Sequence, residues 1–562
     1  MPSLDTNPRL LLRRGRSQGR WIGHEPIFPS SDLSPYLNPG TAPSSPLAAS
    51  TREILRWCLP ALLVGLALRV ALTLYMPLAF LSPDTNEFFS SRLFGGSRTF
   101  LPKLIYELPA RLGLPLLPSV AAFQHLLGLI MIVACGFLCV RWLRAWRWWI
   151  IPFTLLVAVH PTLLWYEHFA LPDSTFTCLL ILAFLAGSRF CEQPTPAKFG
   201  MFFAVLLLVA GARQEGFLFL AFGVALTIRA FWGNMRLARV FVPLALLAAA
   251  GIVFITRTNQ GGYMLLTSLI QWAPDRLRSE PGLSDRIVTL REHFKPIWVV
   301  YPEDHNTSRK LIVAQVEEYL AVERGVPEKE LRDRTEAMCK RVSFEVARGN
   351  FWRLPGLVFN KFRASHLEDP APDFGPGWAY DKQLRIFFGK PNEKPPKEHK
   401  MMKLYLGREY ASREEMEADL PRLYRIFPHD LLSRFQKAFY ECEYALPVVP
   451  AEYFSPQSLP GLPLFYFLTA AGFLAVAIRD GRALSERQMW IVMLLFQAFV
   501  IFLTGSLRSR YRLSFEPWFF LGLFALLDAL AGWRRGRSAP PAALGSQSES
   551  TPQQSAHPAR EQ

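Results

Sequence analysis

The 562-residue sequence lacks the short motifs that mark several common enzyme classes. It has neither common Gly-rich phosphate loop, no His-Glu-x-x-His, no clustered Cys/His metal site and no Ser-centred nucleophile elbow. Each of these motifs supplies groups on which its chemistry depends, so their absence argues against nucleotide hydrolysis and zinc proteolysis. No internal repeat, heptad run or low-complexity tract occurs between the two tails.

Cysteine is scarce, with seven residues in the chain. Cys339 and Cys442 fall in a large hydrophilic segment, and they could pair if that segment faces an oxidising compartment. Spacing alone cannot show that they are close, so a disulfide and two free thiols both remain open. Four other cysteines lie in apolar stretches, where Cys behaves as a small apolar residue; they are Cys58, Cys135, Cys139 and Cys178.

Apolar sequence, in contrast, is abundant: 51% of the residues are hydrophobic, including 44 Phe and 15 Trp. A helix needs about 20 mostly apolar residues to cross a membrane, because no water in the hydrocarbon core can satisfy a bare backbone. The sequence therefore predicts an all-α polytopic membrane protein with about ten transmembrane helices. The ten stretches are 54–79, 116–140, 148–164, 170–188, 199–212, 216–231, 240–256, 460–478, 488–504 and 514–532.

Basic residues mark one side of the predicted spans. In short loops, Lys and Arg are enriched on the cytoplasmic side of a membrane. Both termini are therefore predicted to be cytoplasmic, which requires an even number of spans. Much of the net charge of +16 comes from these residues, which anionic lipid headgroups attract, so no nucleic-acid partner is expected. Representative members are Arg52, Arg56, Arg141, Arg144, Arg147, Arg236, Arg239, Arg479, Arg487 and Arg534.

The spans divide the chain into modules. Disordered cytoplasmic tails are predicted at 1–53 and 533–562. Residues 54–256 form an N-terminal transmembrane module of about seven helices, whose first outer loop covers 80–115. Residues 460–532 form a C-terminal module of three helices.

The long hydrophilic segment 257–459 lies between an outward-going and an inward-returning span. It is therefore predicted to be an inserted extracytoplasmic domain, mainly helical and large enough for its own core. Apolar stripes predict helices over 309–324 and 328–348. Residues 351–366 mix aromatic with basic side chains, so a helix lying at the membrane surface and an amphipathic helix packed on the domain core both remain open.

Charged residues gather at the outer ends of the spans, beginning with the first outer loop. Asp84 and Glu87 directly follow the first span. A carboxylate at the membrane surface is desolvated, so its pKa can rise and it can act as a base toward a hydroxyl group. Asp84 could instead cap a helix that begins near Thr85, since Asp is a favoured N-cap residue.

Two further outer turns carry ionisable residues at membrane depth. The hairpin from His160 to Asp173 joins the third and fourth spans and also contains Glu167. Such groups are costly in a membrane and usually mark a function or a partner. Arg213 and Glu215 occupy the outer turn between the fifth and sixth spans, where they could simply neutralise one another.

The outer loop between the ninth and tenth spans contains three Arg residues, against the positive-inside tendency. An anionic ligand at the membrane surface explains them, because Arg presents a planar fork of donors suited to bidentate phosphate binding. An inverted topology is the alternative, and the basic clusters on the opposite side argue against it. The loop residues concerned are Arg508, Arg510, Tyr511 and Arg512.

The order of these parts resembles the GT-C class of integral membrane glycosyltransferases, in particular the branch of protein O-mannosyltransferases and lipid A aminoarabinose transferases. The resemblance lies in an acidic first outer loop, a Pro-led hairpin ending in an acid, an Arg-x-Glu-Gly turn and a late Arg-rich loop before Pro. Here these parts are Asp84 with Glu87, Pro161 to Asp173, Arg213 to Gly216 and Arg508 to Pro517, within residues 54–256 and 460–532.

The resemblance implies an enzyme of the bacterial inner membrane that moves a sugar from a polyprenyl-phosphate donor to an extracytoplasmic protein, lipid or glycan acceptor. Asp84 would be the base and Glu87 would assist it. The family often has these two acids adjacent, whereas Thr85 and Asn86 separate them here. Whether the first-loop carboxylates hold a divalent metal stays open.

The resemblance also assigns the basic residues. Arg508, Arg510, Arg512 and Arg213 would hold the departing lipid phosphate, which needs charge stabilisation more than a strong acid. An oligosaccharide ligase or polymerase would use the same lipid-carrier chemistry. A transporter or lipid flippase would also explain charges at membrane level, although it predicts repeated halves that this chain lacks.

Overall fold

In the computed structural model of the chain, the described residues are 50–81, 85, 99–232, 235–255, 262–294, 302–364, 384–389, 402–423, 434, 447–449, 462–480, 485–504 and 512–538. The described residues from Thr51 onward belong to one compact unit. The two predicted disordered tails lie almost entirely outside the described residues.

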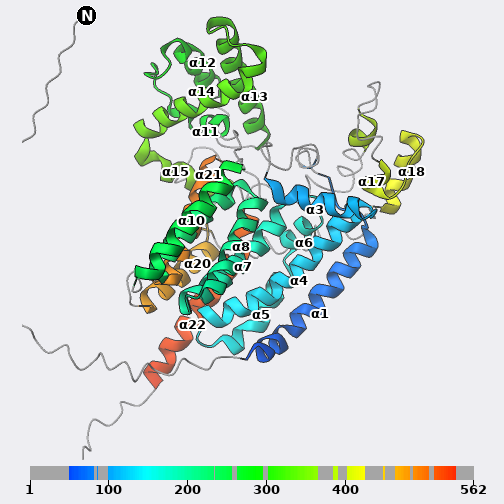
Figure 1. The fold of residues 1–562 in the computed structure, drawn as a ribbon, viewed down its shortest axis with the longest axis vertical. Coiled ribbons are helices and arrows are strands. Elements are labelled where there is room, and N and C mark those ends of the chain that lie inside the picture. Colours follow the sequence, from blue (N-terminus) through cyan, green and yellow to red (C-terminus); the bar gives the residue numbers. More distant parts are fainter. Residues whose placement is uncertain are drawn as a thin grey trace, which may run out of the picture. The chain divides into compact units, whose positions relative to one another are not determined.

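The described residues are predominantly helical (Figure 1), which confirms the predicted all-α class. Each of the ten predicted apolar stretches contains helix. The corresponding helices are α1 (Thr51–Tyr75), α4 (Leu116–Trp142), α5 (Trp146–Val159), α6 (Pro161–Glu167), α7 (Asp173–Glu192), α8 (Pro196–Ala212), α9 (Phe217–Ala230), α10 (Met235–Ile255), α20 (Leu464–Arg479), α21 (Glu486–Thr504) and α22 (Glu516–Ser538).

Five helices in the described part of the chain are long and apolar enough to cross a membrane. Helices α5 and α6 pass the same test together, but they are bent by 50° relative to each other at the break between them. α8 and α20 are shorter apolar helices. These helices are those of a multi-pass membrane protein. The five spans are Thr51–Tyr75, Leu116–Trp142, Asp173–Glu192, Glu486–Leu503 and Leu513–Arg534.

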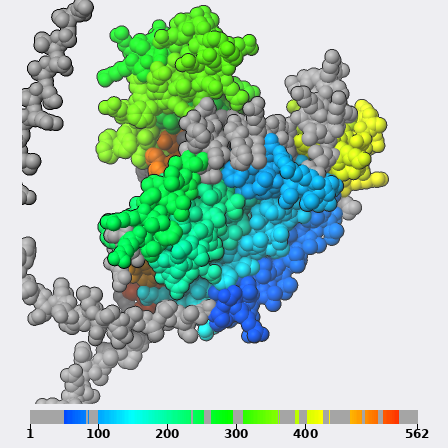
Figure 2. Space-filling model, in the orientation of Figure 1, coloured from blue at the N-terminus to red at the C-terminus, as the bar shows by residue number. Residues whose placement is uncertain are grey.

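Large apolar side chains cover the outside of the bundle, as expected for helices that face lipid. Figure 2 shows α1 in blue and α10 in green at the surface. Leu74 of α1 and Leu247 of α10 are among the exposed residues, as are Leu474 of α20 and Leu495 of α21. A water-soluble protein rarely exposes this much contiguous apolar surface. α7, in contrast, is the most deeply buried of the five spans.

The bend between α5 and α6 differs from the predicted continuous span 148–164. α5 ends at Val159 and α6 begins at Pro161. Proline can start a helix but cannot continue one, because it has no N–H to donate and its ring clashes with the preceding turn. The Nδ1 atom of His160 accepts a hydrogen bond from the backbone N–H of Leu163 at 3.3 Å, which caps the new helix.

In the C-terminal module, α20 and α22 lie in direct backbone contact at two glycines. A methyl group at Gly472 would clash with the carbonyl oxygen of Gly522. Small residues allow membrane helices to approach this closely, which strengthens van der Waals packing where no hydrophobic effect acts between helices.

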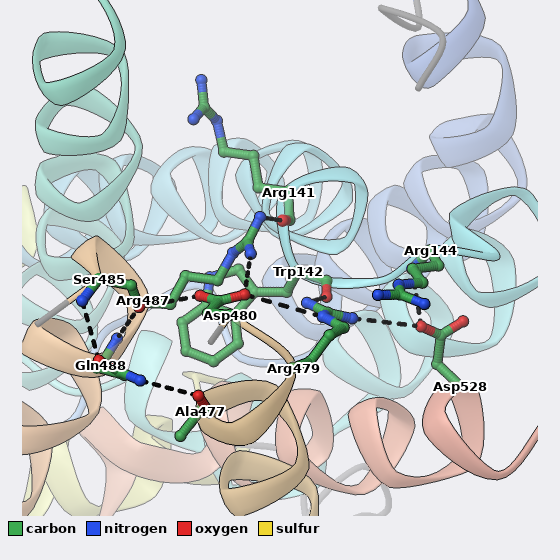
Figure 3. Close-up of polar contacts among 10 residues, drawn as sticks. All are labelled: Arg141, Trp142, Arg144, Ala477, Arg479, Asp480, Ser485, Arg487, Gln488 and Asp528. Atoms are coloured by element: carbon green, nitrogen blue, oxygen red, sulfur yellow. Dashed lines mark hydrogen bonds and ion pairs between the residues drawn. The ribbon is translucent and has the colours of Figure 1, made fainter. Parts of the chain in front are cut away.

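A polar network joins the two modules at the turn between α4 and α5 (Figure 3). The carboxylate of Asp528 on α22 accepts hydrogen bonds from the backbone N–H groups of Arg144 and Ala145, at 2.7 and 2.8 Å. Arg479 of α20 donates to the carbonyl oxygen of Trp142 at 2.7 Å and lies 3.7 Å from Asp528. The Asp528 carboxylate therefore caps the N-terminus of α5 and is itself paired with a cation.

Arg487 of α21 extends this network. One of its terminal nitrogens donates to Asp480, and the other donates to the carbonyl oxygen of Arg141, each at 2.7 Å. The sequence predicted these Arg residues only as inside-facing charges near lipid headgroups. Arg479 and Arg487 also hold the C-terminal module against the N-terminal one.

Residues 262–364 form a separate helical cluster, called here the helical lobe. Its core includes Ile312, Val316, Cys339 and Val342. The apolar stripes predicted for 309–324 and 328–348 face this core, as expected. Leu311 belongs to the first predicted stripe but is exposed instead. The lobe consists of α11 (Gly262–Leu269), η3 (Ile270–Trp272), η4 (Pro281–Leu283), α12 (Ser284–Phe294), α13 (Pro302–Glu318), η5 (Tyr319–Glu323), α14 (Glu328–Gly349), η6 (Phe351–Arg353) and α15 (Leu354–Ala364).

The remaining elements are short. They are α3 (Phe100–Arg111), η2 (Gln214–Gly216), α17 (Met402–Leu406), α18 (Arg413–Leu423), η11 (Leu513–Phe515) and an antiparallel pair, β1 (Pro447–Val449) with β2 (Leu462–Pro463).

Within the segment 351–366, helix α15 packs on the lobe core, as one of the two alternatives predicted, whereas Phe351 and Trp352 before it are exposed. Leu354 and Leu357 belong to the lobe core. Val358 and Phe362 pack against a second cluster that contains Phe502 of α21, so α15 joins the lobe to the spans. Cys339 is a free thiol buried in the lobe core, where burial raises its pKa to about 12, and Cys442 lies outside the described residues.

Candidate functional site around the 160–173 hairpin

The parts of the predicted site meet at the 160–173 hairpin, which consists of α6 and the turn into α7. The segment after α1 runs beside this turn as a parallel β-bridge between Phe80 and Phe169. Phe80 donates to the carbonyl oxygen of His168, and Ala170 donates to that of Phe80, each at 2.8 Å. Backbone hydrogen bonds thus fix the start of the first outer loop against the hairpin.

Asp84 and Glu87, the predicted catalytic acids, lie outside the described residues. The nearest described residues on either side of Asp84 are Leu81 and Thr85, and both are buried. The Thr85 hydroxyl donates to the carbonyl oxygen of Ala170 at 3.0 Å. The chain therefore contacts the hairpin on both sides of Asp84, and the proposed roles of the two acids stay predictions.

Glu167, at the end of α6, forms a buried ion pair that the sequence analysis did not foresee. Its oxygens accept from Arg69 of α1 in a two-bond arrangement, Nη2 to Oε1 at 2.6 Å and Nε to Oε2 at 2.8 Å. Arg69 also donates to the carbonyl oxygens of Gly65 and Ala158. Both charged groups are almost fully buried, and the Glu167 carboxylate compensates the charge of Arg69.

Two histidines extend this pair. His125 of α4 lies with its Nδ1 atom 3.1 Å from Glu167 and its Nε2 atom 3.1 Å from Nδ1 of His168. All four side chains are buried. Arg69, His125, Glu167 and His168 form a continuous polar chain across α1, α4 and the hairpin.

Asp173, at the other end of the hairpin, contacts the predicted Arg-x-Glu turn. Arg213 forms an ion pair with Asp173 and donates twice to Glu215, at 3.1 and 3.0 Å. The prediction that Arg213 and Glu215 pair is confirmed, with Asp173 as a second acid. Tyr106 of α3 lies close by, and burial together with the Asp173 charge raises the pKa of its phenol far above the usual value.

The late Arg loop reaches the first end of the hairpin. Arg508, Arg510 and Tyr511 lie outside the described residues, whereas Arg512 is buried and donates from Nε to Glu516 at 3.0 Å. The second oxygen of Glu516 lies 3.5 Å from Nε2 of His160. The positive charge of Arg512 is therefore balanced inside the protein.

Of the predicted site residues, Asp173, Arg213 and Glu215 thus form one group at the hairpin. Glu167 belongs instead to the group with Arg69, and Arg512 to the group with Glu516. Arg69 and His125 were not among the predicted site residues, although an ionisable residue within an apolar stretch is a usable signal for a functional or paired group. Tyr106 gave no such signal, because tyrosine is common where a helix meets the membrane surface.

Within the described ranges, no three His, Cys, Asp or Glu side chains are arranged to hold a metal ion. The first-loop carboxylates of Asp84 and Glu87 fall outside those ranges, so this finding does not test whether they bind a divalent metal.

Comparison of the chain with protein-family models, with curated proteins and with solved structures found no match. The resemblance to GT-C glycosyltransferases therefore depends on the motifs and their sidedness.

Proposed function

We propose that this protein is a membrane glycosyltransferase that moves a sugar from a polyprenyl-phosphate donor to an extracytoplasmic acceptor. One observation carries the proposal: three sequence-distant parts of the predicted site contact the same hairpin. Thr85 contacts Ala170, Arg213 pairs with Asp173, and the Arg512–Glu516 pair lies beside His160. Such convergence is expected of an active site and is not required of unrelated surface loops.

The proposal includes ten spans, both termini in the cytoplasm, the 257–459 segment outside, and a place in the bacterial inner membrane. Helices at all ten predicted stretches support this topology. The inward-predicted Arg479 and Arg487 also contact the α4–α5 turn, which belongs to the same predicted side.

In the proposed reaction, Asp84 accepts the proton of an acceptor hydroxyl as that oxygen bonds to the anomeric carbon of the sugar. The bond between this carbon and the phosphate oxygen breaks, and the lipid phosphate leaves with the electron pair. Positive charge near the phosphate stabilises this step, because charge develops there in the transition state.

The ion pairs narrow the choice of phosphate ligands. Arg213 is compensated by Asp173 and Glu215, and Arg512 by Glu516. An arginine already bound to carboxylates attracts a further anion less strongly. We therefore assign the phosphate contact to Arg508 and Arg510, with Arg213 and Arg512 organising the site around them.

The test is transfer from a panel of labelled polyprenyl-phosphate sugars in membranes that contain the protein. Asp84→Asn keeps the shape of the side chain and its capping ability but removes the base. Transfer should fall by roughly 100-fold or more at unchanged protein abundance. Glu107→Gln, which alters an exposed surface pair on α3, is the matched control. Normal transfer by the Asp84 variant would leave that residue as a helix cap.

The late Arg loop has its own test. Arg508→Ala or Arg510→Ala should raise the apparent KM for the lipid donor, and the Lys variants should do so less, because Lys keeps the charge but loses the bidentate fork. Arg512→Ala should instead lower the yield of folded protein, since it leaves Glu516 buried without its cation. Unchanged donor kinetics in both the 508 and 510 variants would contradict the phosphate assignment.

The same assay separates the other candidate functions. Turnover of a lipid-linked oligosaccharide, but of no single-sugar donor, would indicate a ligase or polymerase. Movement of intact lipid-linked sugar across the membrane without bond cleavage would indicate a flippase.

A further inference from the structure

Three large aromatic side chains project from the helical lobe into solvent. Phe344 near the end of α14 is 70% exposed, Phe351 of η6 is 60% exposed, and Trp352 of η6 is 89% exposed. Arg348 and Arg353 are exposed among them. In the part of the chain that the structure describes, neither Arg forms an ion pair. We call these five residues the aromatic–basic patch.

The patch is not an incompletely packed part of the lobe core. On α14, Val342 and Val346 face the core while Phe344, between them in sequence, faces outward. On α15, Leu354 and Leu357 are buried immediately after the exposed Trp352. The fold therefore has an apolar interior at this point and presents the aromatic rings away from it.

The patch lies near the end of a membrane span. Helix α15 follows it directly and packs on α21 (Figure 1). The Nζ atom of Lys361 donates to the carbonyl oxygen of Leu503 at 3.3 Å, and the ring of Phe362 lies 5.3 Å from that of Phe502. Leu503 is the last residue of the span Glu486–Leu503. At about 1.5 Å per residue, the nine residues from Trp352 to Lys361 correspond to roughly 14 Å along the helix axis.

The residue types of the patch match the chemistry of a lipid headgroup layer. Trp has an apolar ring with a polar N–H and is enriched where membrane meets water. Arg residues that form no ion pair with the described part of the chain can attract the phosphates of anionic lipids. A surface that binds another protein could lie anywhere on the lobe, so the position of the patch near the end of a span favours lipid as its partner.

We propose that the aromatic–basic patch inserts into the membrane interface, with Arg348 and Arg353 binding anionic lipid phosphates beside it. The proposal requires that α21 spans the membrane and does not depend on the proposed glycosyltransferase activity.

The test is photocrosslinking in nanodiscs that contain phosphatidylcholine and phosphatidylglycerol. p-Benzoylphenylalanine in place of Trp352 reports what covers the patch, and the adduct is identified by mass spectrometry. The matched control has the same probe in place of Val322, which is 73% exposed on η5. Val322 lies before the start of α14 and Trp352 lies after its end, and this helix of 22 residues is about 33 Å long.

The expected result is a phospholipid adduct at 352 that is at least several-fold more abundant than at 322. Phosphatidylglycerol should be enriched in the adduct beyond its share of the nanodisc. Combining Arg348→Gln with Arg353→Gln should remove this enrichment while the lipid adduct at 352 persists. A protein adduct at 352, from a second copy or another chain, would overturn the proposal. Equal lipid yields at 352 and 322 would also overturn it, and absence of phosphatidylglycerol enrichment would overturn the headgroup assignment.

Discussion

At the residue scale, the Arg69–Glu167 pair shows how a charge can lie inside an apolar bundle. Two short hydrogen bonds join the guanidinium to the carboxylate, and the Nη1 atom of Arg69 donates to the carbonyl oxygens of Gly65 and Ala158. Neither charge is left unpaired, which is the condition under which buried ionised groups persist. The pair links α1 to the hairpin and thereby holds the first outer loop beside it.

We expect Glu167→Gln to lower the free energy of unfolding by about 3–5 kcal/mol, because it leaves the Arg69 cation buried without a compensating charge. Thermal unfolding in detergent measures the loss. Combining Arg69→Met with Glu167→Met should recover much of it, since no charge then remains unpaired. Glu107→Gln removes the acid of the exposed Arg111 pair and should have little effect. Equal losses of unfolding free energy in Glu167→Gln and Glu107→Gln would show that burial does not increase the contribution of the Arg69–Glu167 pair to stability.

The buried Lys361 predicts that the stability of the folded protein depends on pH. Burial lowers the pKa of its ammonium group to about 7, while an unfolded lysine titrates near pH 10.4. Between these values the unfolded chain binds a proton that the folded protein does not. This lysine therefore makes the folded state more stable as the pH rises from about 7 to about 10, and it adds no slope below pH 7.

Lys361→Met should consequently flatten the rise of the unfolding midpoint between pH 7.5 and about 9.5. Lys340→Met, which changes a half-exposed lysine on α14, should leave the rise in place. An unchanged slope in the Lys361 variant would mean that other groups cause the pH dependence.

At the element scale, the sequence predicted where helices form but not how they pair. Apolar length located all ten helical stretches, and 3.6-residue periodicity located α13 and α14, because both signals are local. The Arg69 partner of Glu167 and the approach of His160 to Glu516 could not be predicted, because spacing along the chain does not say which spans are neighbours. The Arg512–Glu516 pair, in contrast, has the local spacing of four residues. Leu311 lies in the predicted apolar stripe of its helix but faces solvent, because the helix presents the adjacent Ile312 to the core.

The α5 N-terminus gives a second element-scale prediction. Asp528→Asn keeps the shape of the side chain but removes the charge that faces Arg479 and weakens the cap on Arg144 and Ala145. The expected loss is about 1–3 kcal/mol, since hydrogen bonds to charged groups contribute that much. Glu192→Gln, which affects an exposed pair with Arg141, is the control. Thermal unfolding of the two variants, measured side by side, decides whether the cap matters.

At the scale of the whole molecule, the proposed topology can be tested with impermeant thiol reagents. Val322→Cys places an exposed thiol on the lobe, and Arg236→Cys places one near the predicted inner end of α10. In intact cells the first should be labelled and the second should not. The unmodified protein gives the background from its own cysteines. The reverse pattern would place the hairpin site on the cytoplasmic side and remove the basis for an extracytoplasmic acceptor.

The contacts of the hairpin also set an order for biosynthesis. Arg69 and Glu167 are 98 residues apart, so their pair can form soon after the fourth predicted span leaves the ribosome. Glu516, which faces His160, is synthesised about 350 residues later, a delay of roughly 20 to 70 s at about 5–20 residues per second. During that interval the N-terminal helices stand in the bilayer with one end of their hairpin incomplete. The yield of the full-length protein should therefore depend on how well the N-terminal helices persist in the bilayer until α22 is inserted.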